Sequence, residues 1–313
     1  MLQRRILLSV LSALLISGNA YAGKLALVID DFGYRPKEEN QVLKLPVAIS
    51  VAVLPNAPMA RQMATRAHQQ GREVLIHLPM APLSKQPLEK DTLRPDMSQD
   101  EIARIIHDAS LKVPYAIGLN NHMGSAMTSN LAGMQKVMRV LDHYNYYFLD
   151  SMTIGNSQAT RAAAGTNVKV IKRRVFLDDS PNEASIRQQF TRAVRLAERD
   201  GWAIAIGHPH PNTVRVLQQM LPELPADVTL VRPSQLLNEA QRVDNTPPAG
   251  RPGNKPHSSF RGGQTCMIKH PLPPVPATRA LMVVSESVTA SPLVQKVTSG
   301  FSGLHLNFSS LKQ

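Results

Sequence analysis

Cysteine, aromatic residues and acidic residues are all scarce in this chain of 313 residues. The single cysteine, Cys266, cannot form an internal disulfide, which excludes a disulfide-stapled miniprotein. Aromatic residues make up only 4% of the chain, but hydrophobic residues as a whole make up 43%, which excludes a disordered or collagen-like chain. A domain without disulfides has to be stabilised by its own hydrophobic core, and residues 23–245 are long enough to form one.

The shortage of acidic residues is uneven along the chain. Lys and Arg number 35 against 23 Asp and Glu, a formal net charge of +12. Residues 23–245 carry 26 basic and 22 acidic side chains, a net +4, whereas residues 246–313 carry 7 and 1, a net +6. The main segment is therefore nearly balanced, and it contains no basic cluster interleaved with aromatic residues. We expect no nucleic-acid partner.

The N-terminus has the three parts of a secretory signal peptide. Basic residues in Met1–Arg5 precede the apolar run Ile6–Ile16, and Ala20–Ala22 forms an A-x-A cleavage site. A membrane anchor is the alternative, but an apolar run this short does not cross ~30 Å of hydrocarbon at about 1.5 Å per residue. Residues 1–22 are predicted to be cleaved, and the mature protein is expected in the periplasm or secreted, without a transmembrane span.

Short β-rich apolar runs alternate with amphipathic runs through residues 23–245. This alternation predicts βα units around a mainly parallel sheet, either a (β/α) barrel or a doubly wound sheet. Ser98, with Glu101 three residues later, predicts one helix start, and Ser180 before a proline and a glutamate predicts another with Ser180 as its cap. Residues 246–313 are rich in Pro, Gly and Ser, and we expect a largely unstructured basic tail there. The predicted strands are Lys24–Ile29, Val47–Val53, Glu73–Leu78, Ala116–Leu119, Tyr146–Leu149, Val168–Ile171 with Val175–Leu177, Trp202–Ile206 and Val228–Val231.

Ligand sites in such folds form at the carboxyl ends of the strands, so polar residues directly after each strand are candidates for a site. Asp30 and Asp31 end an apolar strand, where two adjacent carboxylates repel each other and are costly to bury without a cation or a proton. A bound metal would divide the pair into one ligand and one general base that takes a proton from water. The alternative is that one Asp caps the turn near Gly33 and the other is solvated.

Two histidines lie at the ends of neighbouring predicted strands. His77 lies within an apolar run, and His122 lies in an Asn-Asn-His segment whose Gly124 permits a tight backbone. Together with one Asp they would form a three-ligand set with an open position for water, as in catalytic zinc sites. Each histidine alone also fits a hydrogen-bonded structural residue.

Other polar residues at the same predicted edge are candidates for acid catalysis or for binding and orienting the substrate. His208, which lies nearest its strand, is the preferred general acid, and His210 is an alternative. Both also fit a second pair of metal ligands or plain loop histidines. Arg173 or Arg174 would neutralise carboxylates or bind an anionic substrate group, unless they form a solvated basic turn. The residues predicted to bind or orient the substrate are Asn121, Asp150, Arg174 and His210.

Five segments carry most of these residues: Leu25–Gly33 (LALVIDDFG), Gly71–Pro82 (GREVLIHLPMAP), Gly118–Thr128 (GLNNHMGSAMT), Phe148–Ser151 and Ile204–His210. In this order they resemble the sequence blocks of the divergent polysaccharide deacetylases, a group related to the chitooligosaccharide and peptidoglycan deacetylases. The resemblance covers about residues 20–245. It implies an α/β fold, a deformed (β/α) barrel of about seven strands, with a divalent metal, usually zinc, held by an Asp and two His.

Carried over by position, the resemblance implies that Asp30 is the catalytic base and that Asp31 and His77 bind the metal. It also matches His208 to the general-acid histidine near the end of the domain. In ordinary members a second metal-binding His follows the first by four residues, but here that position is Ala81. We predict that a histidine from the next block, His122, replaces it.

Two hypotheses of function follow. The first is an exported metal-dependent hydrolase of carbohydrate metabolism that removes N-acetyl or O-acetyl groups from an amino-sugar polymer, such as peptidoglycan or another N-acetylated glycan. The second, motivated by Ala81, is a catalytically degenerate module that binds cell-wall glycan or an envelope partner. Convergence of His77 and His122 on Asp31 within ligand distances would favour the first hypothesis.

Overall fold

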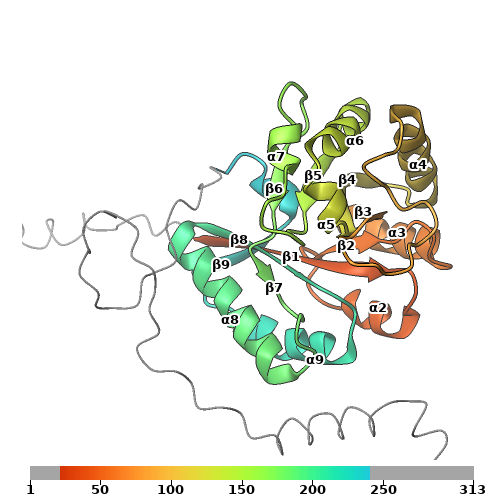
Figure 1. The fold of residues 1–313 in the computed structure, drawn as a ribbon. Coiled ribbons are helices and arrows are strands. Elements are labelled where there is room, and N and C mark those ends of the chain that lie inside the picture. Colours follow the sequence, from red (N-terminus) through yellow and green to blue (C-terminus); the bar gives the residue numbers. More distant parts are fainter. Residues whose placement is uncertain (1–21, 240–313) are drawn as a thin grey trace, which may run out of the picture. The chain divides into compact units, whose positions relative to one another are not determined.

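The computed structural model describes residues 22–239 (Figure 1), and the predictions made for residues 1–21 and 246–313 lie outside this range. Strands and helices alternate along the described residues, as expected for βα units. The strands are β1 (Gly23–Phe32), β2 (Ser50–Val53), β3 (Val74–Met80), β4 (Ala116–Met123), β5 (Tyr147–Asp150), β6 (Val170–Lys172), β7 (Val175–Phe176), β8 (Trp202–Gly207) and β9 (Val228–Val231). The helices are α2 (Pro36–Val42), α3 (Ala60–Gln69), α4 (Gln99–Lys112), α5 (Ser125–Thr128), α6 (Leu131–Tyr144), α7 (Ala159–Ala162), α8 (Glu183–Asp200) and α9 (Pro211–Met220), with 3-10 turns at Leu221–Glu223 and Pro233–Leu236.

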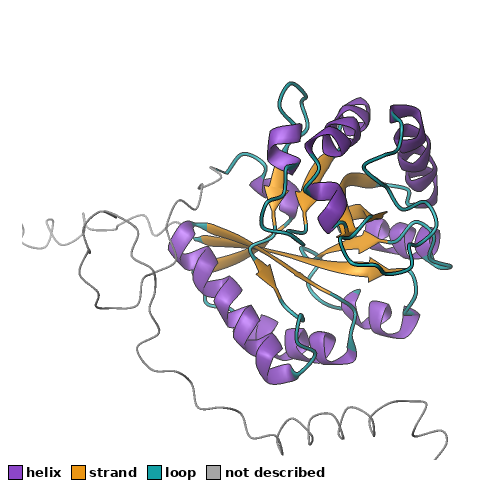
Figure 2. Ribbon diagram, in the orientation of Figure 1, coloured by secondary structure: helices purple, strands orange, loops and turns teal. Residues whose placement is uncertain are grey.

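The paired strands form one parallel sheet with the order β6-β5-β4-β3-β2-β1-β8-β7, and β9 pairs with β1. Helices lie outside the sheet (Figure 2). Strands β6 and β7 end this order and are not paired with each other, so the barrel is incompletely closed. The deformed (β/α) barrel is therefore confirmed. It has nine strands among the described residues instead of about seven, because β6 and β7 are separate short strands and β9 pairs with the first residues of β1.

Alternate residues of each strand face two different hydrophobic cores. In β1, Ala26 and Val28 belong to the smaller cluster, which is built almost entirely from strand residues and fills the barrel interior. Leu25 and Leu27 belong to the larger cluster between the sheet and the helices. Because side chains alternate along a strand, Asp30 continues the inner row and reaches the carboxyl edge of the barrel.

The structure confirms one predicted helix start and corrects the other. The Ser98 side chain accepts a hydrogen bond from the Glu101 backbone N–H, and the Glu101 carboxylate accepts one from the Ser98 backbone, which completes a capping box. Helix α8 is capped by Asn182, whose Oδ1 accepts from the Ser185 N–H, so the prediction of Ser180 as the cap was wrong. Asn182 lies directly before the helix and is an equally good cap, and its Nδ2 donates to Ser180 Oγ instead.

The turn after β1 is fixed by a buried carboxylate and a close backbone approach. Glu39 Oε1 accepts hydrogen bonds from the N–H groups of Gly33 and Arg35 at 2.8 and 2.6 Å. Burial raises the pKa of Glu39, although these N–H donors oppose the shift. Gly33 has φ +117°, and a Cβ placed there would lie 2.4 Å from the Ala57 Cβ. This turn therefore needs glycine for both conformation and space.

We expect Gly33→Ala to lower the free energy of unfolding by about 2–4 kcal/mol, from backbone strain plus overpacking. Urea unfolding followed by circular dichroism measures the change. Gly155→Ala is the matched control, because a Cβ there meets nothing within 4 Å and the φ of Gly155 is not in the left-handed region. Equal stabilities for the two variants would contradict this account of the turn.

Candidate metal centre

A β-bulge at the end of β1 turns both carboxylates of the Asp pair toward one histidine. The pairing register between β1 and β2 shifts between Ile29 and Phe32, and Asp31 has φ +58°, a conformation rare for residues other than glycine. Asp30 Oδ2 lies 3.6 Å from Nδ1 of His77, and Asp31 Oδ1 lies 3.2 Å from Nε2 of the same ring. Without the bulge, alternation would direct adjacent side chains to opposite faces.

Three side chains converge at this point with the geometry of a metal site. His77 Nε2, His122 Nδ1 and Asp31 Oδ1 are 3.0, 3.1 and 3.2 Å from one another. Two imidazole nitrogens and one carboxylate oxygen this close together are a donor set that would hold a divalent ion such as zinc. Asp31 Oδ1 is buried and accepts no well-directed hydrogen bond, so it is an orphaned acceptor facing two ring nitrogens. The residues therefore fit a divalent ion with an open coordination position.

Hydrogen bonding leaves the inward nitrogen of His77 available as a ligand. Asn120 Nδ2 donates to Asp30 Oδ1 at 2.8 Å, which fixes the orientation of the amide. Asn120 Oδ1 then faces His77 Nδ1 at 2.9 Å and accepts its proton. The lone pair of His77 is consequently on Nε2, the atom that points at Asp31 and His122.

His122 is oriented in the same way by a carboxylate from a different loop. Its Nε2 lies 3.3 Å from Glu89 Oε1, and Glu89 belongs to the segment between β3 and α4. With the proton on Nε2, the Nδ1 lone pair faces the ligand triangle. Glu89 was not among the residues selected from the sequence, because it follows no strand directly.

The two neighbouring carboxylates have opposite electrostatic environments. Burial raises the pKa of Asp30, which is 2% exposed. Burial also opposes ionisation of Asp31, but the facing nitrogens of His122 and His77 hold its pKa well below the usual range. Asp31 is thus held in the ionised form that a metal ligand needs, and Asp30 has the higher proton affinity that suits a general base.

His208 approaches the centre from β8, on the far side of Asp31. Its Nδ1 is 2.9 Å from Asp178 Oδ1, its backbone N–H donates to Asp178 Oδ2 at 2.7 Å, and Thr213 Oγ1 donates to the same oxygen. Its Nε2 is 3.9 Å from Asp31 Oδ2. Burial disfavours the charged ring, but Asp178 outweighs this effect and raises the pKa of His208 to about 9. His208 is therefore protonated at neutral pH and directs an N–H toward the centre.

Two residues predicted to bind or orient the substrate form structural hydrogen bonds in this fold. Asn121 Oδ1 accepts from the Ser151 N–H at 2.9 Å, and its Nδ2 donates to the carbonyl of Met123, so it ties the ends of β4 and β5 together. Asp150 accepts hydrogen bonds from the Met152 N–H and from a serine hydroxyl within its own loop. Neither side chain is hydrogen-bonded to a histidine of the centre, and their roles in binding or orienting stay predictions. Each belongs to the outward row of its strand, and the residue at the centre is Asn120.

The side chains of Arg173 and Arg174 point to different parts of the fold, and His210 lies beside His208. Arg174 Nη2 pairs with Asp200 Oδ2 at 2.6 Å and its Nη1 donates to the Trp202 carbonyl, at the first residue of β8 and away from the metal centre. Arg174 therefore lies apart from the metal centre, and its role in binding the substrate stays a prediction. Arg173 donates to two carbonyls of the loop after β5. His210 stacks on His208 with ring centroids 5.6 Å apart.

We expect Glu89→Gln to weaken zinc binding by about tenfold, because the amide orients His122 without the negative charge that strengthens the ligand. Competition with a chromophoric chelator on the full chain measures the affinity. Asp96→Asn is the matched control, because Asp96 lies on the same segment with a side chain that is 74% exposed. Equal zinc affinities for the two variants would contradict the role assigned to Glu89.

Comparisons with known proteins agree with this architecture. Residues 27–237 match the family model described as divergent polysaccharide deacetylase. The chain is 64% identical over 291 residues to the uncharacterized protein YibQ of Escherichia coli (strain K12), covering 93% of this chain and 91% of YibQ. It is 44% identical over 220 residues to an uncharacterized protein of Haemophilus influenzae (strain ATCC 51907 / DSM 11121 / KW20 / Rd), covering 70% of this chain and 79% of that protein.

A solved structure shares the fold. The crystal structure of an uncharacterized protein from Agrobacterium tumefaciens C58 superposes with a TM-score of 0.66 at 20% identity, covering 70% of this chain and 91% of that one. No helix among residues 22–239 is long and apolar enough to cross a membrane. The family model covers two thirds of the sequence and includes every residue of the metal centre. The chain therefore belongs to the divergent polysaccharide deacetylase family.

Proposed function

We propose that the protein is an exported, metal-dependent hydrolase that removes acetyl groups from an N-acetylated amino-sugar polymer, peptidoglycan being one such polymer. The observation that carries this proposal is the convergence of Asp31, His77 and His122, with a carboxylate of raised pKa on one side and a protonated histidine on the other. Family membership supports the deacetylase type of chemistry. The predicted signal peptide at residues 1–22 supports export.

The ligands favour zinc among the divalent metals, because two imidazoles and one carboxylate are the donors of many catalytic zinc sites. Such an ion, when bound, acts as a Lewis acid and makes water a nucleophile at neutral pH. Ala81 has no ligand atom, but His122 would supply the second imidazole. The presence of His122 beside His77 and Asp31 therefore weakens the case for a degenerate binding module.

Each remaining step is assigned to a side chain of this protein. Asp30 takes the proton of the attacking water, a role that suits its buried, raised-pKa carboxyl. Asn120 holds both Asp30 and His77 in place through its amide. His208 donates its Nε2 proton to the leaving nitrogen, while Asp178 keeps the ring charged and correctly oriented. Base and acid therefore stand on different strands, β1 and β8, around the reacting carbonyl.

Asp30→Asn is expected to lower acetate release from N-acetylglucosamine oligosaccharides by about 10²–10⁴-fold, since an amide does not accept the proton. Zinc content by elemental analysis should stay near that of the unmodified chain, because Asp30 is not in the ligand triangle. The exposed Asp227 provides the control variant Asp227→Asn, which should retain full turnover. Turnover that survives in Asp30→Asn would refute the assignment of the base.

The rate should fall at alkaline pH as His208 loses its proton. The Asp178 carboxylate raises the pKa of His208 to about 9, so the acid form persists through neutral pH and disappears above pH 9. Asp178→Asn removes the charge that raises this pKa, and the alkaline limb of kcat/KM should move toward lower pH. Thr213→Val is the control, because it removes a hydrogen bond to the same carboxylate but leaves its charge. An alkaline limb that stays in place in Asp178→Asn would contradict the role of His208.

A further inference from the structure

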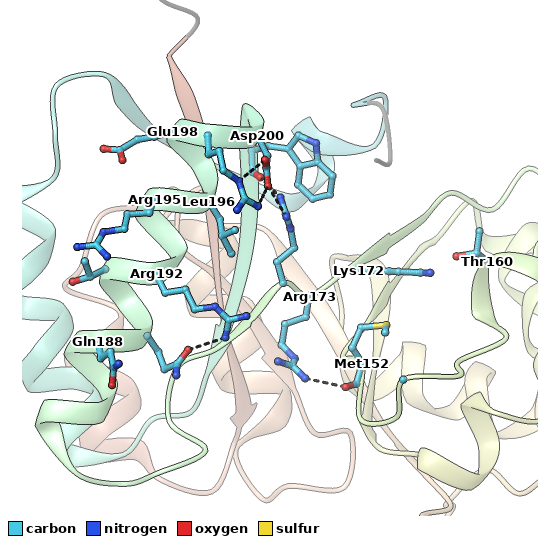
Figure 3. A pocket seen from close by; sticks show the side chains of 16 residues that line it. Met152, Thr160, Lys172, Arg173, Gln188, Arg192, Arg195, Leu196, Glu198 and Asp200 are labelled. Atoms are coloured by element: carbon cyan, nitrogen blue, oxygen red, sulfur yellow. Dashed lines mark hydrogen bonds and ion pairs between the residues drawn. The ribbon is translucent and has the colours of Figure 1, made fainter. Parts of the chain in front are cut away.

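A large cleft opens where the barrel fails to close. It has a volume of about 1530 Å³ and lies between α8 and the chain that runs from the end of β5 through β6 to residue 174 (Figure 3). The volume exceeds the range of about 300–1,000 Å³ that is usual for small-molecule pockets. The cleft is therefore large enough for part of a polymer.

The charged side chains that line this cleft are predominantly cationic. Only Glu198 and Asp200 oppose them among the lining residues, and Asp200 already accepts hydrogen bonds from Arg174 and Arg199. A surface with this imbalance attracts anions. The cationic lining residues are Lys172, Arg173, Arg174, Arg192, Arg195 and Arg199.

Two guanidinium groups face each other across the cleft. Figure 3 shows Arg192 reaching from α8 toward Arg173, which comes from the opposite wall. Arg173 donates to the carbonyls of Ser151 and Met152 at 2.6 and 2.9 Å, and Arg192 donates to Gln189 at 3.4 Å. Neither arginine forms an ion pair with a carboxylate in the described part of the chain. An anion bound between two such guanidinium groups would offset the repulsion between their positive charges.

Arg173 connects the cleft to the metal centre. Its two hydrogen bonds fix the loop that follows β5, and Ser151 of this loop is bound to Asn121 of β4, the strand that carries His122. The Arg173 guanidinium also packs over the Phe176 ring at 4.9 Å from its centroid, which holds it in place. The end of the cleft that Met152 and Arg173 line therefore lies at the carboxyl edge of the barrel, where the metal centre also lies, whereas the end that Trp202 lines is at the first residue of β8.

We propose that this cleft binds an anionic group of the glycan substrate, a carboxylate or a phosphoryl group, between Arg173 and Arg192. This inference rests on the proposed function and adds to it the class of polymer, an acidic glycan. The tail of the chain itself is an unsuitable occupant, because residues 246–313 carry a net charge of +6. A nucleic acid is disfavoured because the only aromatic ring in the lining, Trp202, has Arg174 stacked over it.

Binding is tested by calorimetry on the full chain carrying Asp30→Asn, so that turnover does not interfere. The probes are a neutral tetrasaccharide of N-acetylglucosamine, the same tetrasaccharide with a carboxylate on one sugar, and the same with a phosphate monoester. We expect at least one charged probe to bind about tenfold more tightly than the neutral one, with the gain falling as salt rises. The charged probe that shows the higher affinity indicates whether the glycan group is a carboxylate or a phosphate.

Adding Arg192→Gln should abolish this gain and leave the affinity for the neutral probe unchanged. Arg187→Gln is the matched control on the same helix, because Arg187 pairs with Glu183 and does not line the cleft. The proposal is overturned if neither charged probe binds more tightly than the neutral one, if the gain persists in Arg192→Gln, or if single-stranded DNA binds as tightly as the best glycan.

The two proposals fail in different ways. Acetate release by the unmodified chain without any preference for charged probes would refute the anionic subsite and leave the deacetylase function standing. A preference that depends on Arg192 in a chain that releases no acetate from any of the three probes would refute the hydrolase and leave the glycan-binding cleft.

Discussion

The site depends on two adjacent carboxylates at the end of β1, of which Asp30 is buried and Asp31 is partly exposed. Such a pair is unstable in a protein interior unless positive charge or protons compensate it. Here the bulge at Asp31 places both carboxylates against one imidazole, with Asp30 near one ring nitrogen of His77 and Asp31 near the other. The unlike surroundings drive their pKa values in opposite directions, which separates a ligand from a base.

All three histidines of the centre are oriented by the same physical device. An oxygen acceptor fixes one ring nitrogen, and the other nitrogen is thereby directed at the reacting position: Asn120 does this for His77, Glu89 for His122 and Asp178 for His208. The acceptors differ in charge: Asn120 offers a neutral amide oxygen to His77, whereas the Asp178 carboxylate raises the pKa of His208 and thereby suits it to act as an acid.

Most of the fold and the ligand set could be predicted from the sequence, because strand ends and polar residues are local features. Because successive side chains of a strand point to opposite faces, Asn120 and His122 of β4 point to the barrel interior and Asn121 points outward. In β5, Leu149 likewise points to the interior and Asp150 points outward. Applying that period would have placed Asn120 in the inner row of β4, and Asn121 and Asp150 in the outward rows of their strands. The bulge at Asp31, the reach of Glu89 and the divergence of Arg173 from Arg174 depend on tertiary contacts that no local pattern encodes.

The replacement of a ligand at Ala81 is consistent with the packing around it. The Ala81 carbonyl accepts hydrogen bonds from the N–H groups of Ala126 and Met127 in α5, and its own N–H donates to Leu93. Ala81 thus joins the segment after β3 to the first turn after His122, and only 8% of it is exposed. His122 lies on β4, and the segment after β3 supplies Glu89, whose Oε1 is 3.3 Å from Nε2 of that histidine. The imidazole proposed as the second ligand and the carboxylate that orients it therefore come from the two segments of chain that Ala81 joins.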